Sequence, residues 1–124
     1  MHKLVILIEP LEDWDAFEEA WPTFLHLVET MPALKREAIS RVERFLYGEI
    51  PYAQMHELYF ENLDAAQEAM ASDQGRTAGK LLQAMTGGRM ALFFADHKED
   101  DLENIQKYRT QSNSAPGAQE NGDG

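Results

Sequence analysis

The chain has 124 residues, the length of one domain with a single hydrophobic core. Its net charge of −11 argues against a nucleic-acid or anionic-membrane partner, because both would repel it at long range. The absence of cysteine excludes disulfides, thiolate nucleophiles and cysteine-based metal sites.

The chain opens with a strand pattern followed by a helix pattern. Leu4–Ile8 is a continuous apolar run, typical of a strand buried on both faces. It is far shorter than the ~20 residues that cross a bilayer and lacks the features of a signal peptide, so we expect a cytoplasmic protein. From Phe17 to Met31 apolar residues recur every three or four positions, which predicts a helix. Asp13 or Asp15 should cap it, and Pro22 should kink or restart it.

The middle of the chain predicts two strands of different character. Residues 34–47 are densely charged, which indicates an edge strand, because charge there blocks pairing with another sheet. After a turn at Gly48 and Pro51, residues 54–61 carry apolar side chains on both alternating faces. This second strand is therefore expected at the centre of the sheet.

The second half repeats the order of helix and strand. Asn62 should cap a helix, Ser72 should cap its continuation, and Gly87-Gly88 should end it in the left-handed conformation. Met90–Ala95 follows as a last strand, apolar on both faces.

Two β-α-β units in succession predict an α+β domain of the ferredoxin-like βαββαβ type, with a four-stranded antiparallel sheet and helices on one face. The helices leave the other apolar face bare, so we expect a second copy to cover it and form a homodimer. The domain should span residues 1–97. Residues 98–109 are expected to form a short helix, and 110–124 a disordered tail, since they have almost nothing to bury.

Several stretches resemble the EthD family of the dimeric α+β barrel superfamily. The resemblance covers about residues 3–97 and rests on Leu58–Ala66 with Ala69, Ser72 and Gly75, on the Gly-Gly before the last strand, and on Met31–Arg36. It implies a homodimer of facing sheets and a small ligand pocket between sheet and helices. EthD is associated with ether degradation alongside a cytochrome P450 system. Relatives include cofactor-free monooxygenases, muconolactone isomerase and polyketide cyclases.

The chain departs from this family in the first helix. EthD-like proteins commonly carry a His, one residue and a Pro shortly before Met-Pro. Counted back from Met31-Pro32, that His falls on Phe24 and that Pro on His26. His26 lies two positions, about 200°, around a helix from the family's His position, so the resemblance gives it no catalytic role.

His56 is the first candidate for chemistry. It shares a strand face with Leu58 and Phe60, and an imidazole in apolar surroundings can act as acid or base. The alternative is a core or interface histidine satisfied by a backbone group. His26 and Tyr59 are the second candidates for catalysis.

Three further residues are candidates for ligand binding. Glu57 shares the opposite strand face with Tyr59, where it could take a proton or, alternatively, pair with Arg41 or Arg44. Trp21 and Phe24 are either core residues or the walls of an apolar pocket.

The four histidines show no metal-ligand spacing, and no phosphate or dinucleotide motif is present, so we expect no metal and no cofactor. The sequence thus predicts a protein that binds or transforms a small, mostly apolar organic molecule, by acid–base or oxygen chemistry without a cofactor. The alternative is a non-catalytic binding or accessory subunit with a vestigial pocket.

Overall fold

The structure is a computed structural model that describes residues 1–103. The tail expected at 110–124 and the second half of the short helix expected at 98–109 lie outside the described residues. The elements follow in the order β1 (His2–Ile8), α1 (Trp14–Glu29), β2 (Arg36–Arg41), β3 (Gln54–Phe60), α2 (Leu63–Ala71), α3 (Asp73–Thr86) and β4 (Met90–Asp96). All strand pairs are antiparallel, in the order β2-β3-β1-β4. The predicted ferredoxin-like α+β fold is confirmed.

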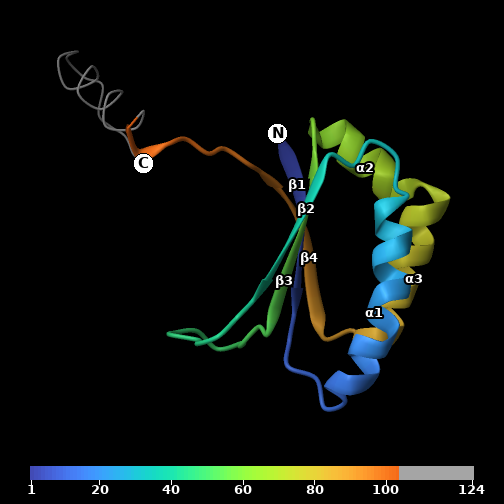
Figure 1. Ribbon diagram of the computed structural model, residues 1–124, viewed down its shortest axis with the longest axis vertical. Coiled ribbons are helices and arrows are strands. Elements are labelled where there is room, and N and C mark those ends of the chain that lie inside the picture. The colour runs from blue at the N-terminus through green and yellow to red at the C-terminus, as the bar shows by residue number, and fades with distance from the viewer. Residues whose placement is uncertain (104–124) are drawn as a thin grey trace.

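The helices form one layer on one side of the sheet (Figure 1). α1 packs against α3, and α2 contacts β1 and β3. Strand residues facing this layer alternate along the sequence, so the core consists of every second side chain of β1 and β3 together with the apolar stripes of the helices. The largest fully buried members are Phe17, Phe24, Phe60, Ile6, Ile8, Leu58 and Leu82.

The helix ends follow the predicted signals closely. The side chain of Asp13, rather than that of Asp15, accepts the Ala16 N–H at 3.0 Å and begins α1. α1 continues through Pro22 as one helix instead of restarting there. Asn62 caps α2 and Ser72 caps α3, as predicted.

The open face of the sheet, defined as the side away from the helices, differs from the bare apolar surface that the sequence predicts. At its centre Lys3 pairs with Glu57, and both side chains are largely buried. The Arg36 guanidinium lies 4.1 Å from the Tyr59 ring, and the His97 ring lies 4.9 Å from it. Charged side chains of this chain therefore cover the centre of the face.

Most of the exposed large apolar side chains lie on β4 and on the β2–β3 arm, the connection formed by residues 42–53. On β4 they are Leu92, Phe93 and Phe94, and on the arm they are Val42, Phe45, Leu46, Tyr47 and Ile50. The arm and the segment after β4 both extend away from the sheet on the side opposite the helices (Figure 1). β2 itself ends at Arg41, earlier than the charged stretch that predicts it.

Candidate functional site

A buried polar pair lies in the layer between the sheet and α1. His56 on β3 faces the helices, and its side chain is 0% exposed. Its Nε2 lies 3.3 Å from Oε2 of Glu37 on the neighbouring strand β2. The two residues meet because Ile39 is directly opposite His56, so Glu37, two positions away, projects from the same face. We call this the His56–Glu37 pair.

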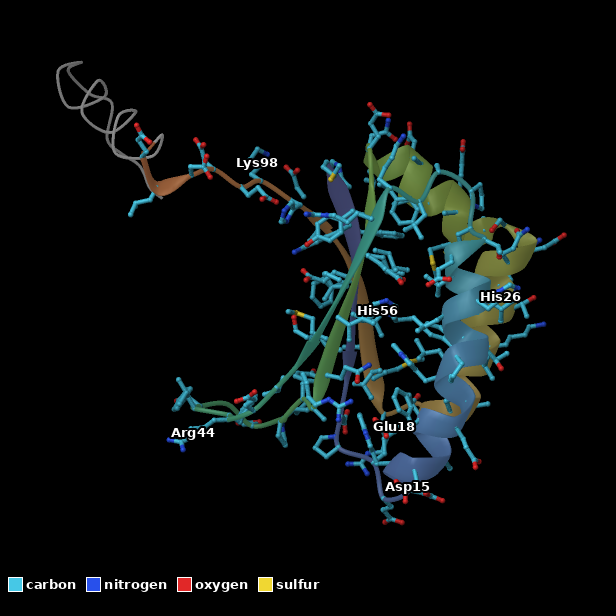
Figure 2. All side chains as sticks on the ribbon, viewed as in Figure 1. Asp15, Glu18, His26, Arg44, His56 and Lys98 are labelled. Atoms are coloured by element: carbon cyan, nitrogen blue, oxygen red, sulfur yellow. The ribbon has the colours of Figure 1, made fainter. Side chains whose placement is uncertain are left out.

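Aromatic rings of α1 form the other wall around His56. The ring centroid of Trp21 lies 5.2 Å from that of His56, and the centroid of Phe24 lies 6.0 Å from it. Figure 2 shows His56 in the space between the sheet and α1. Trp21 and Phe24 therefore contact the first catalytic candidate, while Phe24 also belongs to the hydrophobic core and Trp21 packs against that core.

Burial controls the protonation of the pair. Desolvation lowers the pKa of His56 to about 4, so the imidazole is neutral at neutral pH. Burial, together with the neighbouring Glu29 carboxyl, raises the pKa of Glu37. When Glu37 is ionised, the neutral ring donates Nε2–H to the carboxylate and leaves Nδ1 as an acceptor. Nδ1 is buried and has no hydrogen-bond partner among the described residues, an arrangement that costs about 1–3 kcal/mol.

The remaining candidates lie elsewhere. His26 is exposed on the outer side of α1 (Figure 2). Glu57 and Tyr59 project from the open face of the sheet, because they alternate with His56 along β3. The sequence-predicted site residues thus fall in three places, and only Trp21 and Phe24 join His56.

The predicted partner of Glu57 is wrong. Glu57 pairs with Lys3 of β1 rather than with Arg41 or Arg44. Lys3 lies diagonally across from Glu57 on the open face, whereas Arg41 projects toward the helices and pairs with Glu18 at 3.1 Å. The Glu57 side-chain hydrogen bond raises the pKa of Lys3. This pair therefore stabilises the sheet from the side opposite the His56–Glu37 pair.

Sequence reasoning missed Glu37 as a member of the site. Glu37 lies in a densely charged stretch, where the pattern indicates only a solvated edge strand. Its partner depends on the register between β2 and β3, which no local signal in the sequence specifies. Among residues 1–103, no three His, Asp or Glu side chains gather in a way that could hold a metal ion. In the same part of the chain, no helix is long and apolar enough to cross a membrane.

Solved structures of other proteins share the fold of this chain. No family model and no curated protein matches the chain. The chain is similar to a solved EthD family protein from Bacillus halodurans, with 29% identity and a TM-score of 0.72 over 79% of this chain and 99% of the other. It shares the fold of a dimeric ferredoxin-like protein from Thermobifida fusca at 14% identity, with a TM-score of 0.60 over 77% and 90% of the two chains.

A third solved structure with this fold is that of an enzyme. SnoaB, a cofactor-independent oxygenase from Streptomyces nogalater, matches with 11% identity and a TM-score of 0.58, over 80% of this chain and 93% of its own. At this identity the likeness shows the fold alone. The match to the Bacillus protein confirms the resemblance to the EthD family that the sequence predicts, and the other two matches agree with the predicted ferredoxin-like fold.

Proposed function

We propose that this protein binds and transforms a small, mostly apolar organic molecule between its sheet and α1, with His56 as the acid–base group. The observation that carries the proposal is the unpartnered Nδ1 of a neutral histidine among aromatic rings. The similarity to an EthD family protein and to a cofactor-independent oxygenase supports it. We expect the protein to act in the cytoplasm.

The chemistry follows from the state of the pair. A substrate with a weakly acidic O–H or C–H would place its proton on Nδ1 and become an anion. The Glu37 carboxylate on Nε2 would stabilise the imidazolium that forms, as a carboxylate does behind a catalytic histidine. The substrate anion could then be reprotonated at another carbon, which is an isomerisation, or could react with oxygen. Both reactions proceed without a cofactor.

A homodimer is the proposed form of the protein. On β4, Phe93 lies directly across from Val5 and projects from the open face, where a second sheet would meet it. The β2–β3 arm, which carries exposed apolar side chains, extends on the same side of the sheet. Burying one Leu or Phe contributes about 1.5–3 kcal/mol, so several per subunit outweigh an association cost of roughly 4–15 kcal/mol. Solved neighbours described as dimeric ferredoxin-like proteins support this arrangement.

One observation favours the second candidate, a non-catalytic binding or accessory subunit. His56 is completely enclosed, and Trp21 and Phe24 pack directly against it. A substrate reaches Nδ1 only if these rings move. An accessory protein with a vestigial site would keep the interior closed.

Ligand binding can be followed at the histidine rings of the full chain. Titration with 2-naphthol, an apolar phenol, should shift the NMR signals of the His56 ring and leave those of exposed His26 unchanged. His56→Gln should weaken naphthol binding and abolish any turnover, whereas His26→Gln should do neither. If His56→Gln keeps both binding and turnover, the histidine is not part of the site. Saturable binding without turnover in any variant would support the accessory subunit.

A further inference from the structure

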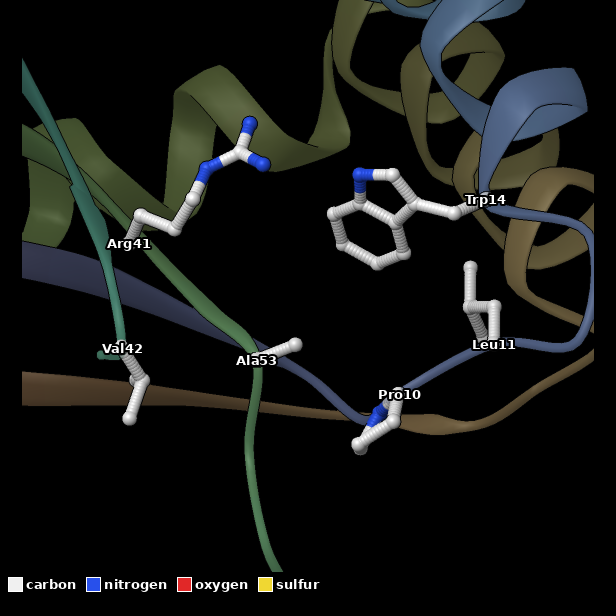
Figure 3. Close-up of a pocket in the computed structure, with 6 residues that line it drawn as sticks. All are labelled: Pro10, Leu11, Trp14, Arg41, Val42 and Ala53. Carbon is white, nitrogen blue, oxygen red and sulfur yellow. The ribbon is translucent and has the colours of Figure 1, made fainter. Parts of the chain in front are cut away.

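A pocket lies at the end of the sheet, and His56 is not among its lining residues. It has a volume of about 330 Å³ and is bounded by the β1–α1 connection, the start of α1 and the ends of β2 and β3. We call it the Trp14–Arg41 pocket. Its lining residues are Pro10, Leu11, Trp14, Arg41, Val42 and Ala53 (Figure 3). The volume is at the lower end of the ~300–1,000 Å³ typical of ligand sites, which suits a molecule with one ring.

The lining of the pocket divides into a polar end and an apolar end. Arg41 is the one charged residue among the six, and its guanidinium carbon lies 5.8 Å from the Trp14 ring. Figure 3 shows the indole nitrogen directed toward the Arg41 end, with Pro10, Leu11 and Ala53 on the other side. The polar end therefore offers hydrogen-bond donors and a positive charge, while the apolar end offers hydrocarbon surface.

Both polar groups have unused donors. Trp14 Nε1 is buried and has no hydrogen-bond partner among residues 1–103. Arg41 makes one ion pair in the described chain, from a single Nη2 to Glu18, and both side chains are about half exposed or more. A guanidinium carries five N–H donors in a planar fork, which matches the two oxygens of a carboxylate. An anionic oxygen placed here would thus find three kinds of support: charge, fork geometry and an unpartnered indole N–H.

We propose that the Trp14–Arg41 pocket binds a small amphipathic carboxylate, with the carboxylate at Arg41 and Trp14 and a single ring against the apolar end. Glu18 is the internal competitor for Arg41, so the ligand exchanges one exposed ion pair for a forked one. Because the pocket uses none of the groups of the His56–Glu37 pair, this proposal stands independently of the proposed catalytic role of His56.

The two tryptophans of the chain, Trp14 and Trp21, allow a direct test. Trp14 lies in the pocket and Trp21 contacts His56, so each reports on one site. In the full chain carrying Trp21→Phe, 3-phenylpropionate should change the emission of Trp14 saturably. In the Trp14→Phe chain the same probe should leave the emission of Trp21 unchanged. Calorimetry of the unaltered chain should give the same affinity for 3-phenylpropionate as the fluorescence titration of the Trp21→Phe chain.

Charge variants then identify the polar end. Arg41→Gln should weaken 3-phenylpropionate binding about tenfold or more, because it removes the charge and the fork. Glu18→Gln should tighten binding by up to about fivefold, because it removes the competitor of an exposed pair. Arg36→Gln is the matched control, since Arg36 projects from the same strand to the opposite face of the sheet. Its affinity should equal that of the unaltered chain.

Three outcomes would overturn the proposal. One is equal affinity for 3-phenylpropionamide, the neutral analogue of the probe. The second is unchanged affinity in Arg41→Gln while the thermal unfolding midpoint is retained. The third is the absence of any saturable response of Trp14 at millimolar probe. None of these results bears on naphthol binding at His56, so the two sites are judged separately.

Discussion

The Nε2 atom of His56 lies 3.3 Å from Oε2 of Glu37, and the imidazole is completely buried between the sheet and α1. A neutral imidazole in this position can donate its Nε2–H to the Glu37 carboxylate. A protonated imidazole could do the same, but burying its charge would cost the free energy of desolvation. The pair joins the edge strand β2 to the central strand β3 through side chains as well as through the backbone.

The pKa of His56 predicts how stability depends on pH. It is about 4 in the folded state against 6.5 for the free side chain. Between these values the unfolded chain binds a proton that the folded chain does not, so the free energy of unfolding falls as pH drops from 6.5 to 4. The loss is about 3 kcal/mol and ceases below pH 4. Urea unfolding at several pH values measures it.

His56→Gln should flatten that pH dependence, and His26→Gln should leave it unchanged because His26 is exposed. The raised pKa of Glu37 acts in the opposite direction, since the folded state binds that proton more readily. The difference between the unaltered chain and His56→Gln therefore isolates the histidine. If His56→Gln keeps the full pH dependence of the free energy of unfolding, burial of His56 is not its cause.

Replacing each of two glycines of α3 by alanine should change the stability of the fold in opposite directions. A Cβ on Gly75 would overlap the carbonyl oxygen of Ala69 and lie 2.7 Å from that of Met70, whereas a Cβ on Gly79 would meet nothing within 4 Å. Gly75→Ala should therefore destabilise the fold by about 1–3 kcal/mol, because backbone must shift. Gly79→Ala should stabilise it by roughly 0.5–1 kcal/mol, through helix propensity alone. Equal effects of the two changes would show that the junction of α2 and α3 is not closely packed.

The Lys3–Glu57 pair predicts a large cost for removing one partner. Its side chains are only 17% and 12% exposed, so Glu57→Gln would leave a mostly buried ammonium without its carboxylate. The free energy of unfolding should fall by about 3 kcal/mol. Arg76→Gln breaks an exposed pair with Asp73 and should change it by less than about 0.5 kcal/mol. Chemical denaturation of both variants compares them; similar small losses would mean that Lys3 is solvated.

The proposed homodimer predicts the effect of one charge on β4. Phe93 is 45% exposed and lies directly across from Val5 on the open face. Phe93→Asp should shift the protein from dimer to monomer in sedimentation at micromolar concentration, because an unpaired carboxylate would be buried between the sheets. Leu63→Asp, at an exposed apolar residue of the helix layer, should remain dimeric. A monomeric unaltered chain would remove the dimer from the proposal.

Local signals in the sequence determined much of the fold. The caps at Asn62 and Ser72 and the stop at Gly87 predict the ends of α2 and α3, and apolar runs locate the other helices and strands, because each signal depends on neighbours within a few positions. The bounds of α1 and β2 are less exact: α1 begins three residues earlier than the apolar stripe, and β2 is shorter than its charged stretch. The face of His56 also follows from strand alternation, and the helical stripe shows that Trp21 and Phe24 lie on the apolar side of α1.

Tertiary structure alone decided the partners of the charged groups. Glu37 meets His56, Lys3 meets Glu57, and Arg41 meets Trp14 across the pocket, and in each case the two residues come from different elements. Composition and periodicity specify which side chains are buried, since burial is a property of one face of one element. They do not specify the register between strands or the seating of α1 on the sheet, and these fix which buried polar atom finds a partner and which is left without one.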